Sequence, residues 1–252
     1  TNIQKTARTV ADILFNGHIH VGKLDFGNIY GYLRYNALEG FRPTFSMRTG
    51  KKFSQRFTVG GYFGYGFGDK EFKYGGNVQL LLGEDEEHYF GLFYNNDVYR
   101  LGYDTKKLLA GKLIGSDENL LTSLSWGQRY DQLLHKQNAI LSYYYERNGL
   151  KISIMPSVSE IYANRFVRFI RGDEEFSQIN TASRLSFKQE RLKSFFRRVY
   201  LSTQYPVITL LGEVGGYRVG YIQGKYAKLT ANVKYNFAFD LGKVYFSAYG
   251  TK

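Results

Sequence analysis

The sequence predicts an all-β protein: an antiparallel meander of about 10–12 strands that forms a transmembrane outer-membrane β-barrel. The composition is one reason, because 23 Tyr, 20 Phe and 28 Gly with only 3 Pro in 252 residues are typical of strands and tight turns. The alternation within the runs is the other. In residues 57–67, Phe57, Val59 and Phe63 alternate with Thr58 and Tyr62, and the second set carries no charge. We therefore expect the apolar face to contact lipid and the small polar face to fill the lumen.

The first half of the chain is predicted to form successive hairpins. Gly50-Lys51-Lys52, Gly68-Asp69-Lys70 and the acidic segment 83–87 are turn signals between alternating runs. Connections this short join antiparallel neighbours rather than β-α-β units. The predicted strands are residues 29–35, 41–48, 57–67, 72–82 and 88–94.

The alternation stops over residues 95–137, where leucines recur at helical spacing. This pattern predicts one helical or long-loop insertion near 105–135, which would be a surface loop, a lumen plug or an interfacial helix. Asn148-Gly149, between two apolar alternating runs, is the strongest hairpin signal in the chain. Residues 156–177 are expected to be irregular. Further strands are expected near 139–145, 150–154, 179–190, 196–203, 206–214, 229–239 and 244–248.

The domain organisation predicted from these runs is a lead-in segment, residues 1–28, and a β-barrel domain, residues 29–252. The last residues stop within a strand rhythm and not on a terminal aromatic residue, so we expect a partial barrel cut from a longer chain. No cysteine is present, which excludes disulfides, thiolate metal sites and cysteine nucleophiles.

The net charge of +12 allows three interpretations. It can reflect nucleic-acid binding, contact with anionic lipid head groups or lipopolysaccharide phosphates, or ordinary solvated surface with lumen arginines. The basic residues form no continuous tract and no nucleic-acid reader motif is present, so no nucleic acid is expected as a partner. The expected partners are outer-membrane lipid, lipopolysaccharide and other envelope proteins.

One stretch resembles a known family. The segments Tyr35-Asn36-Ala37-Leu38-Glu39-Gly40-Phe41-Arg42, Arg48-Thr49-Gly50, Phe53-Ser54-Gln55-Arg56-Phe57 and Phe72-Lys73-Tyr74-Gly75 are similar to a Bacteroidetes family of outer-membrane barrels, domain of unknown function family 5686. The resemblance covers residues 30–80, with a looser match at 205–207 and 225–229. It implies a barrel in the outer membrane of a Gram-negative bacterium. In this family the barrel often follows a carboxypeptidase-regulatory-like binding module, which is absent from this sequence. The family supplies no activity and no catalytic residues.

Three arginines and a glutamate are candidate lumen or turn residues. Glu39 and Arg42 are expected to pair across a turn, with Arg42 and Arg48 facing the lumen. The alternative is a turn that only sets strand register. Arg171 lies in Ile170-Arg171-Gly172-Asp173, which resembles a loop signature of barrels that insert or export proteins, and its alternative is an ordinary turn.

A basic segment is the candidate lipid-phosphate rim, with a solvated hairpin end as the alternative. Its residues are Lys188, Arg191, Lys193, Arg197 and Arg198. His18 and His20, with Asp25, are the nearest approach to a metal site, but no further ligands cluster with them, so no metal and no cofactor is expected.

The function expected from these observations is non-enzymatic: transport, assembly, or anchoring of a periplasmic module in the outer membrane. No nucleophile elbow, P-loop or dinucleotide motif is present. One alternative is a soluble secreted β-barrel that binds a ligand inside, which requires Phe57, Val59, Phe63 and Phe67 to be buried. A second alternative is a membrane-embedded acyl hydrolase or transferase that uses Ser142 or Ser153 with a distant histidine.

Overall fold

All regular structure described in this computed structural model is β-strand, which confirms the predicted all-β class. The structure describes residues 18–27, 32–82, 88–100, 133–164, 174–186, 191–194, 197–200, 205–239 and 242–251. The strands are β1 (Ile19–Val21), β2 (Leu24–Phe26), β3 (Leu33–Asn36), β4 (Gly40–Thr49), β5 (Phe57–Gly66), β6 (Glu71–Leu82), β7 (His88–Arg100), β8 (Leu133–Arg147), β9 (Leu150–Tyr162), β10 (Glu174–Ser186), β11 (Arg191–Ser194), β12 (Arg197–Tyr200), β13 (Val207–Val219), β14 (Ile222–Phe239) and β15 (Gly242–Thr251).

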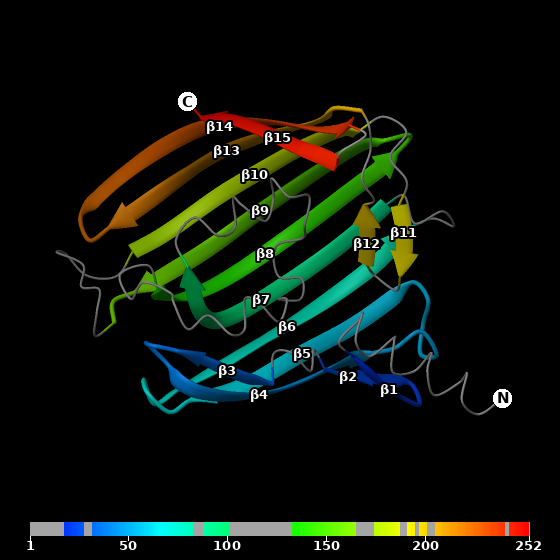
Figure 1. The fold of residues 1–252 in the computed structure, drawn as a ribbon. Coiled ribbons are helices and arrows are strands. Elements are labelled where there is room, and N and C mark those ends of the chain that lie inside the picture. Colours follow the sequence, from blue (N-terminus) through cyan, green and yellow to red (C-terminus); the bar gives the residue numbers. More distant parts are fainter. Residues whose placement is uncertain are drawn as a thin grey trace.

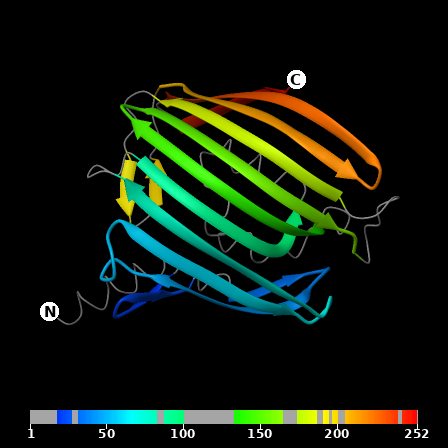
Figure 2. The ribbon, with the colours of Figure 1, turned by 180° about the vertical axis from the view of Figure 1, so that it is seen from behind.

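Thirteen of these strands form one sheet in the order β1-β2-β4-β5-β6-β7-β8-β9-β10-β13-β14-β15, with β3 also paired to β4. Every strand pairing in the described part of this sheet is antiparallel, which confirms the predicted meander. β11 and β12 form a separate two-stranded sheet. Within the described ranges the large sheet is open, running from β1 to β15 and not closed into a barrel. It is nevertheless strongly curved, with both edges bending toward the same side (Figures 1 and 2).

In two regions the strands predicted from the sequence are shorter than those in the structure. β7 continues to Arg100, and β8 begins at Leu133. The last residues of the insertion expected near 105–135 therefore belong to β8. Residues 101–132 lie outside the described residues. The segment expected to be irregular contains the end of β9 and the start of β10. Pro156 does not end β9, because it pairs with Ile179 of β10 at a point where the register with β8 is interrupted. A proline has no N–H to donate, and this gap on the β8 side accommodates it.

The sheet also begins earlier than the first predicted strand. β1 and β2 lie within the residues expected to be a lead-in segment. β2 and β3 pair with opposite halves of β4, Leu24 opposite Thr49 and Leu33 opposite Pro43. Together β2 and β3 cover one edge of β4. The sheet therefore includes residues before residue 29.

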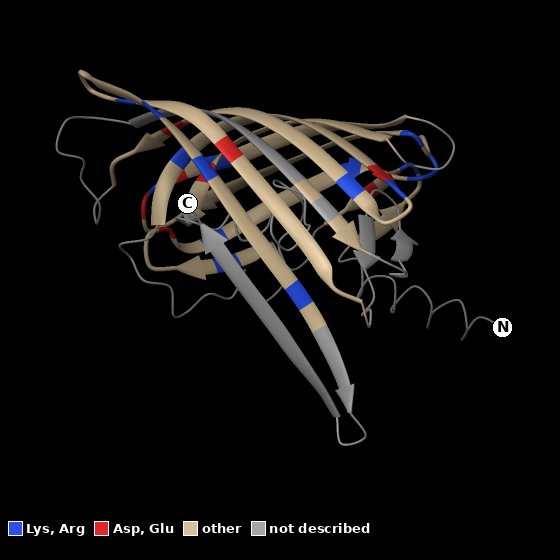
Figure 3. Ribbon diagram, turned by 90° about the horizontal axis from the view of Figure 1, so that it is seen from above, with Lys and Arg blue, Asp and Glu red and all other residues tan. Residues whose placement is uncertain are grey.

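The convex face of the sheet carries large apolar side chains that are exposed. Phe45, Phe63 and Val233, on three separate strands, are all exposed, whereas Thr58 and Ser142 on the opposite face are buried. Most of the length of the strands that Figure 3 colours by charge is tan, so it carries neither acidic nor basic residues. This burial is the reverse of that in a soluble sheet, where the apolar face is covered and the polar face meets water.

The concave face is filled by a mixture of polar and apolar side chains. It carries a buried apolar cluster contributed by five strands, in which Met155 and Leu211 are fully buried. The Tyr144 hydroxyl contacts the Met155 sulfur at 3.0 Å within it. Its members are Leu81, Tyr89, Phe93, Ile140, Tyr144, Met155 and Leu211.

Two tyrosine rings on the concave face each occupy the space above a glycine on the next strand. Tyr62 is paired with Gly75, where an added Cβ would lie 2.5 Å from the Tyr62 ring. Tyr217 is likewise paired with Gly224, where the distance would be 2.4 Å. The glycines therefore make room for rings that cover the backbone, a device that pins strand register.

The β8–β9 turn confirms the hairpin predicted from Asn148-Gly149, with Arg147 paired to Leu150. Both turn residues have positive φ, 49° and 82°, as a type I′ turn requires. An added Cβ at Gly149 would lie 1.9 Å from the Ser186 carbonyl oxygen. The turn therefore needs glycine for its conformation and for the approach of β10.

The variant Gly149→Ala is expected to lower the free energy of unfolding by more than the ~1–2 kcal/mol of a left-handed alanine. The matched control is Gly22→Ala, since Gly22 has φ 63° but nothing within 4 Å of its added Cβ. Urea unfolding followed by circular dichroism measures both. Equal losses for the two variants would show that the contact with Ser186 has no energetic weight.

Candidate functional site

In the β3–β4 turn, the Asn36 side chain holds the buried Glu39 in place. The Asn36 side-chain oxygen accepts hydrogen bonds from the backbone N–H groups of Leu38 (3.0 Å) and Glu39 (2.9 Å), and the Asn36 amide donates to the Glu39 carboxylate. Gly40 adopts φ 65°, and an added Cβ there would lie 3.2 Å from the Gly68 nitrogen. This turn consequently packs against the β5–β6 turn and places Glu39 on the concave side.

Arg42 is the centre of the ion-pair network. Its guanidinium donates to Glu39 (2.8 Å), to both Asp97 carboxylate oxygens (2.5 and 3.0 Å) and to Thr44 (3.2 Å). The Tyr62 hydroxyl donates to Asp97 at 2.8 Å. Burial raises the pKa of the Glu39 carboxyl, the Arg42 charge opposes that shift, and the net pKa is above its usual value.

The Arg42–Asp97 contact joins β4 to β7, which are separated by β5 and β6. In a flat sheet these two strands would lie about 14 Å apart. The contact therefore requires tight curvature at this end of the sheet and places both side chains on the concave face. We call Glu39, Arg42, Tyr62 and Asp97 the clamp.

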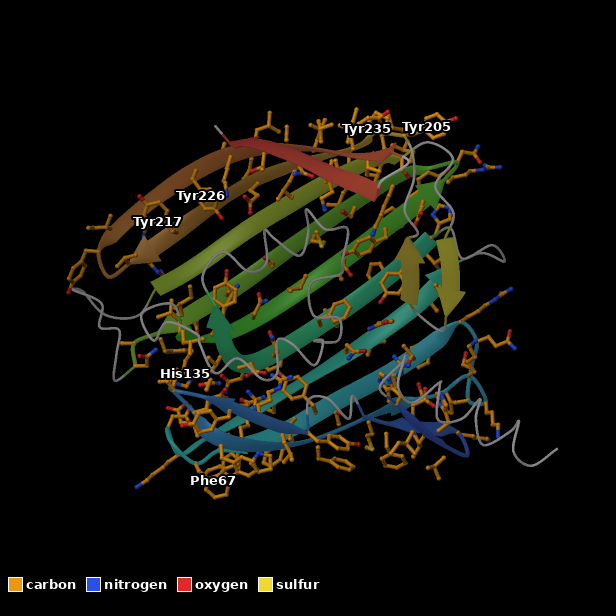
Figure 4. All side chains as sticks on the ribbon, viewed as in Figure 1. Phe67, His135, Tyr205, Tyr217, Tyr226 and Tyr235 are labelled. Atoms are coloured by element: carbon orange, nitrogen blue, oxygen red, sulfur yellow. The ribbon has the colours of Figure 1, made fainter. Side chains whose placement is uncertain are left out.

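A second charged group adjoins the clamp at the same end of the sheet, where Figure 4 labels His135. Lys73, fully buried, donates to Asp69 at 2.8 Å and approaches Glu71 at 3.5 Å. The two His135 ring nitrogens lie 3.6 Å from Asp69 and 3.4 Å from Glu71. The two carboxylates are thus shared between a lysine and a histidine.

The donor atoms of Asp69, Glu71 and His135 lie within 4.8 Å of one another, a spacing that a metal ion can bridge. The Lys73 ammonium, however, is already paired with both carboxylates. A divalent cation would have to displace a buried ammonium and leave it without its partners. The arrangement is better suited to an ion-pair cluster than to a metal centre.

The sequence-predicted site residues lie in three places. Glu39 and Arg42 are together in the clamp, while Arg48 lies at the other end of β4, with its Nε 3.4 Å from Asp25. His20 also contacts Asp25, at 2.5 Å, and His18 is buried. Arg171 and Lys188 lie outside the described residues. Four of the basic rim candidates lie in the β11–β12 hairpin, where the register pairs Lys193 with Arg198 and Ser194 with Arg197, and Arg191 pairs with Tyr200.

Sequence reasoning predicted Glu39 as a partner of Arg42 but missed Asp97. Asp97 lies in Asn95-Asn96-Asp97, at the start of residues 95–137, where the alternation was expected to stop. Asparagine and aspartate are poor strand formers. The sequence offered one signal: Asp97 is a single acidic residue at a position whose side chain, by the alternation of the strand, faces the concave side. Asp69 and His135 meet only through sheet curvature, which no local pattern carries.

Ser142, one of the serines considered for hydrolase chemistry, has a backbone partner. The buried Ser142 hydroxyl donates to the Gly91 carbonyl at 3.2 Å. His88 contacts the Tyr143 hydroxyl at 2.7 Å. Neither bond joins a serine to a histidine.

No family model, no curated protein and no solved structure matches this chain. The resemblance to domain of unknown function family 5686 thus has no support beyond the residues that carry it. Among the residues that the structure describes, no helix is long and apolar enough to cross a membrane.

Proposed function

We propose that this sheet is the lipid-facing wall of an outer-membrane β-barrel in a Gram-negative bacterium, with a non-enzymatic role in transport, assembly or the anchoring of a periplasmic module. One observation carries the proposal. Val59, Val78, Leu92 and Leu141 occupy directly paired positions on four consecutive strands. Their side chains are 41, 39, 51 and 39% exposed. A continuous apolar row of this kind is a liability in water and is expected in contact with acyl chains.

Aromatic side chains flank the apolar row on the convex face. Toward the β5–β6 turn, Phe41 stacks on Phe67 (ring centroids 6.2 Å apart) and Tyr65 contacts Phe72 (5.0 Å). Toward the opposite end, His88 lies 4.9 Å from the Tyr145 ring. Figure 4 likewise places Phe67 at one end of the sheet and Tyr205 and Tyr235 at the other. Aromatic girdles at both membrane interfaces are typical of transmembrane barrels.

The filled concave face favours anchoring or assembly over an open diffusion pore. An aqueous channel needs polar, solvated side chains at its narrowest level. Here the concave face carries the apolar cluster around Met155 and Leu211, both fully buried, and the clamp spans the space between β4 and β7.

The soluble ligand-binding alternative requires the opposite burial. It places Val59, Phe63 and Phe67 in a dry interior, whereas all three are exposed and Thr58 is buried. In the hydrolase alternative, one of the two candidate serines, Ser142, donates its hydroxyl hydrogen to a backbone carbonyl and not to a histidine.

The proposal predicts that the 252-residue chain remains monomeric only in detergent or lipid and migrates faster on gels before heating than after. The reason is that a membrane barrel keeps its compact form in mild detergent until heat unfolds it. Refolding from urea with and without a nonionic detergent, followed by size-exclusion chromatography, measures the first point. A chain that stays monomeric without detergent, with no heat-dependent migration, would contradict the proposal.

A further inference from the structure

Two neighbouring turns at one end of the sheet form an exposed basic surface. The β1–β2 turn contains Lys23, and the β4–β5 connection contains Lys51, Lys52 and Arg56, all four exposed. The two turns are joined by a hydrogen bond from the Gly50 N–H to the Lys23 carbonyl at 2.8 Å. We call these four residues, with Phe53, the basic turn patch.

The patch has an ordered backbone. The Phe53 N–H donates to the Gly50 carbonyl at 2.9 Å, and the Ser54 hydroxyl accepts from the N–H groups of Arg56 (3.2 Å) and Phe57 (3.0 Å). These bonds fix the connection between β4 and β5 as a defined turn. The positions of its cationic residues relative to the sheet are therefore set by the fold.

Asp25, an acidic residue of β2 beside the β1–β2 turn, is already engaged. Asp25 is buried and contacts His20 at 2.5 Å and Arg48 at 3.4 Å. Residues 83–87, which follow β6, are acidic in sequence and lie outside the described residues.

The patch borders the apolar convex face. Phe53 is 52% exposed in the middle of the cationic residues. Val21, Leu24, Met47 and Val59, on the adjoining ends of four strands, are exposed as well. A basic group with an exposed aromatic ring at the edge of an apolar surface matches the boundary between acyl chains and phosphate head groups.

We infer that the basic turn patch binds the phosphate groups of anionic membrane lipids. Lys23, Lys51, Lys52 and Arg56 are the cationic contacts, and Phe53 inserts at the head-group level. This site contains none of the residues of the basic segment 188–198. It gives this end of the sheet a preference for anionic lipid. The inference rests on the proposed membrane location.

The double variant Lys51→Gln/Lys52→Gln tests it. Binding of phosphatidylglycerol and phosphatidylcholine to the full chain in nonionic detergent is measured by native mass spectrometry. The wild-type chain is expected to prefer phosphatidylglycerol. Each lysine near a lipid phosphate changes affinity about fivefold, so the variant is expected to lose the preference by on the order of 20-fold. Added salt is expected to weaken the wild-type preference, because exposed charges are screened.

The matched control is Lys70→Gln/Lys225→Gln, which removes the same charge from exposed lysines at the opposite end of the sheet. This control is expected to keep the preference. An unchanged preference in Lys51→Gln/Lys52→Gln, or an equal loss in the control, overturns the inference. Circular dichroism shows whether each variant folds. The need for detergent is read separately in the wild-type chain, so failure of the proposed membrane location is distinguishable from failure of the patch.

Discussion

Replacing Arg42 with alanine is expected to lower the free energy of unfolding by about 3–5 kcal/mol. Arg42 is 1% exposed, and its guanidinium is bonded to both Glu39 and Asp97. Removing it leaves two carboxylates close together without the cation that stabilises them. Because the contact with Asp97 also joins β4 to β7, the loss should loosen the curvature of this end of the sheet. Urea unfolding in detergent, followed by circular dichroism, gives the change.

Two variants separate the clamp from a general charge effect. Arg56→Ala removes an exposed arginine from a turn, and it is expected to change stability by no more than about 0.5 kcal/mol. The double variant Arg42→Ala/Asp97→Ala removes both partners and is expected to be less destabilised than the sum of the two single variants, because their effects are coupled. A loss for Arg42→Ala no larger than for Arg56→Ala would refute the clamp.

The alternation of residue types was sufficient to predict the meander and the sides of its strands. Phe57, Val59 and Phe63 against Thr58 and Tyr62 is a period of two, and a period of two assigns each residue to a face. The Asn148-Gly149 hairpin was also predictable, because few residue pairs other than Asn-Gly adopt two successive positive φ values easily. These features are local and depend only on the backbone preferences of a few residues.

The parts that were missed depend on neighbours distant in the sequence. Asp97 is a poor strand former by itself, and it is accommodated in β7 because Arg42, 55 residues away, neutralises it. Proline usually interrupts a strand, but the pairing between β8 and β9 is interrupted at Pro156, so the missing N–H of Pro156 is tolerated there. Of the expected ion pairs, only Glu39 with Arg42 was within reach of sequence reasoning, since the two residues share one turn. Asp97 is brought to Arg42 and Tyr62 by the curvature of the sheet.

The variant Leu92→Arg is expected to cost about 2–4 kcal/mol of folding free energy in lipid vesicles, the range for an arginine at the midplane of a transmembrane barrel. Leu92 lies within β7, paired with Val78 and Leu141 on the convex face, and its side chain is half exposed. In a bilayer that exposure means contact with acyl chains, where a guanidinium loses its hydration. In water the same exposure would make the substitution neutral, within about 0.5 kcal/mol. The sign and size of this one change therefore distinguish a lipid-facing surface from a solvent-facing one.

The control for this change is Tyr221→Arg. Tyr221 is fully exposed in the β13–β14 turn, at the end of the sheet. An arginine there is expected to cost about 0–1 kcal/mol, because the cost of a charge falls toward the membrane interface. Reversible urea unfolding of both variants in vesicles of one lipid composition gives the two values. Similar small costs for Leu92→Arg and Tyr221→Arg would mean that the convex face does not meet acyl chains, whereas a large cost confined to Leu92→Arg follows from the depth of that residue in the membrane.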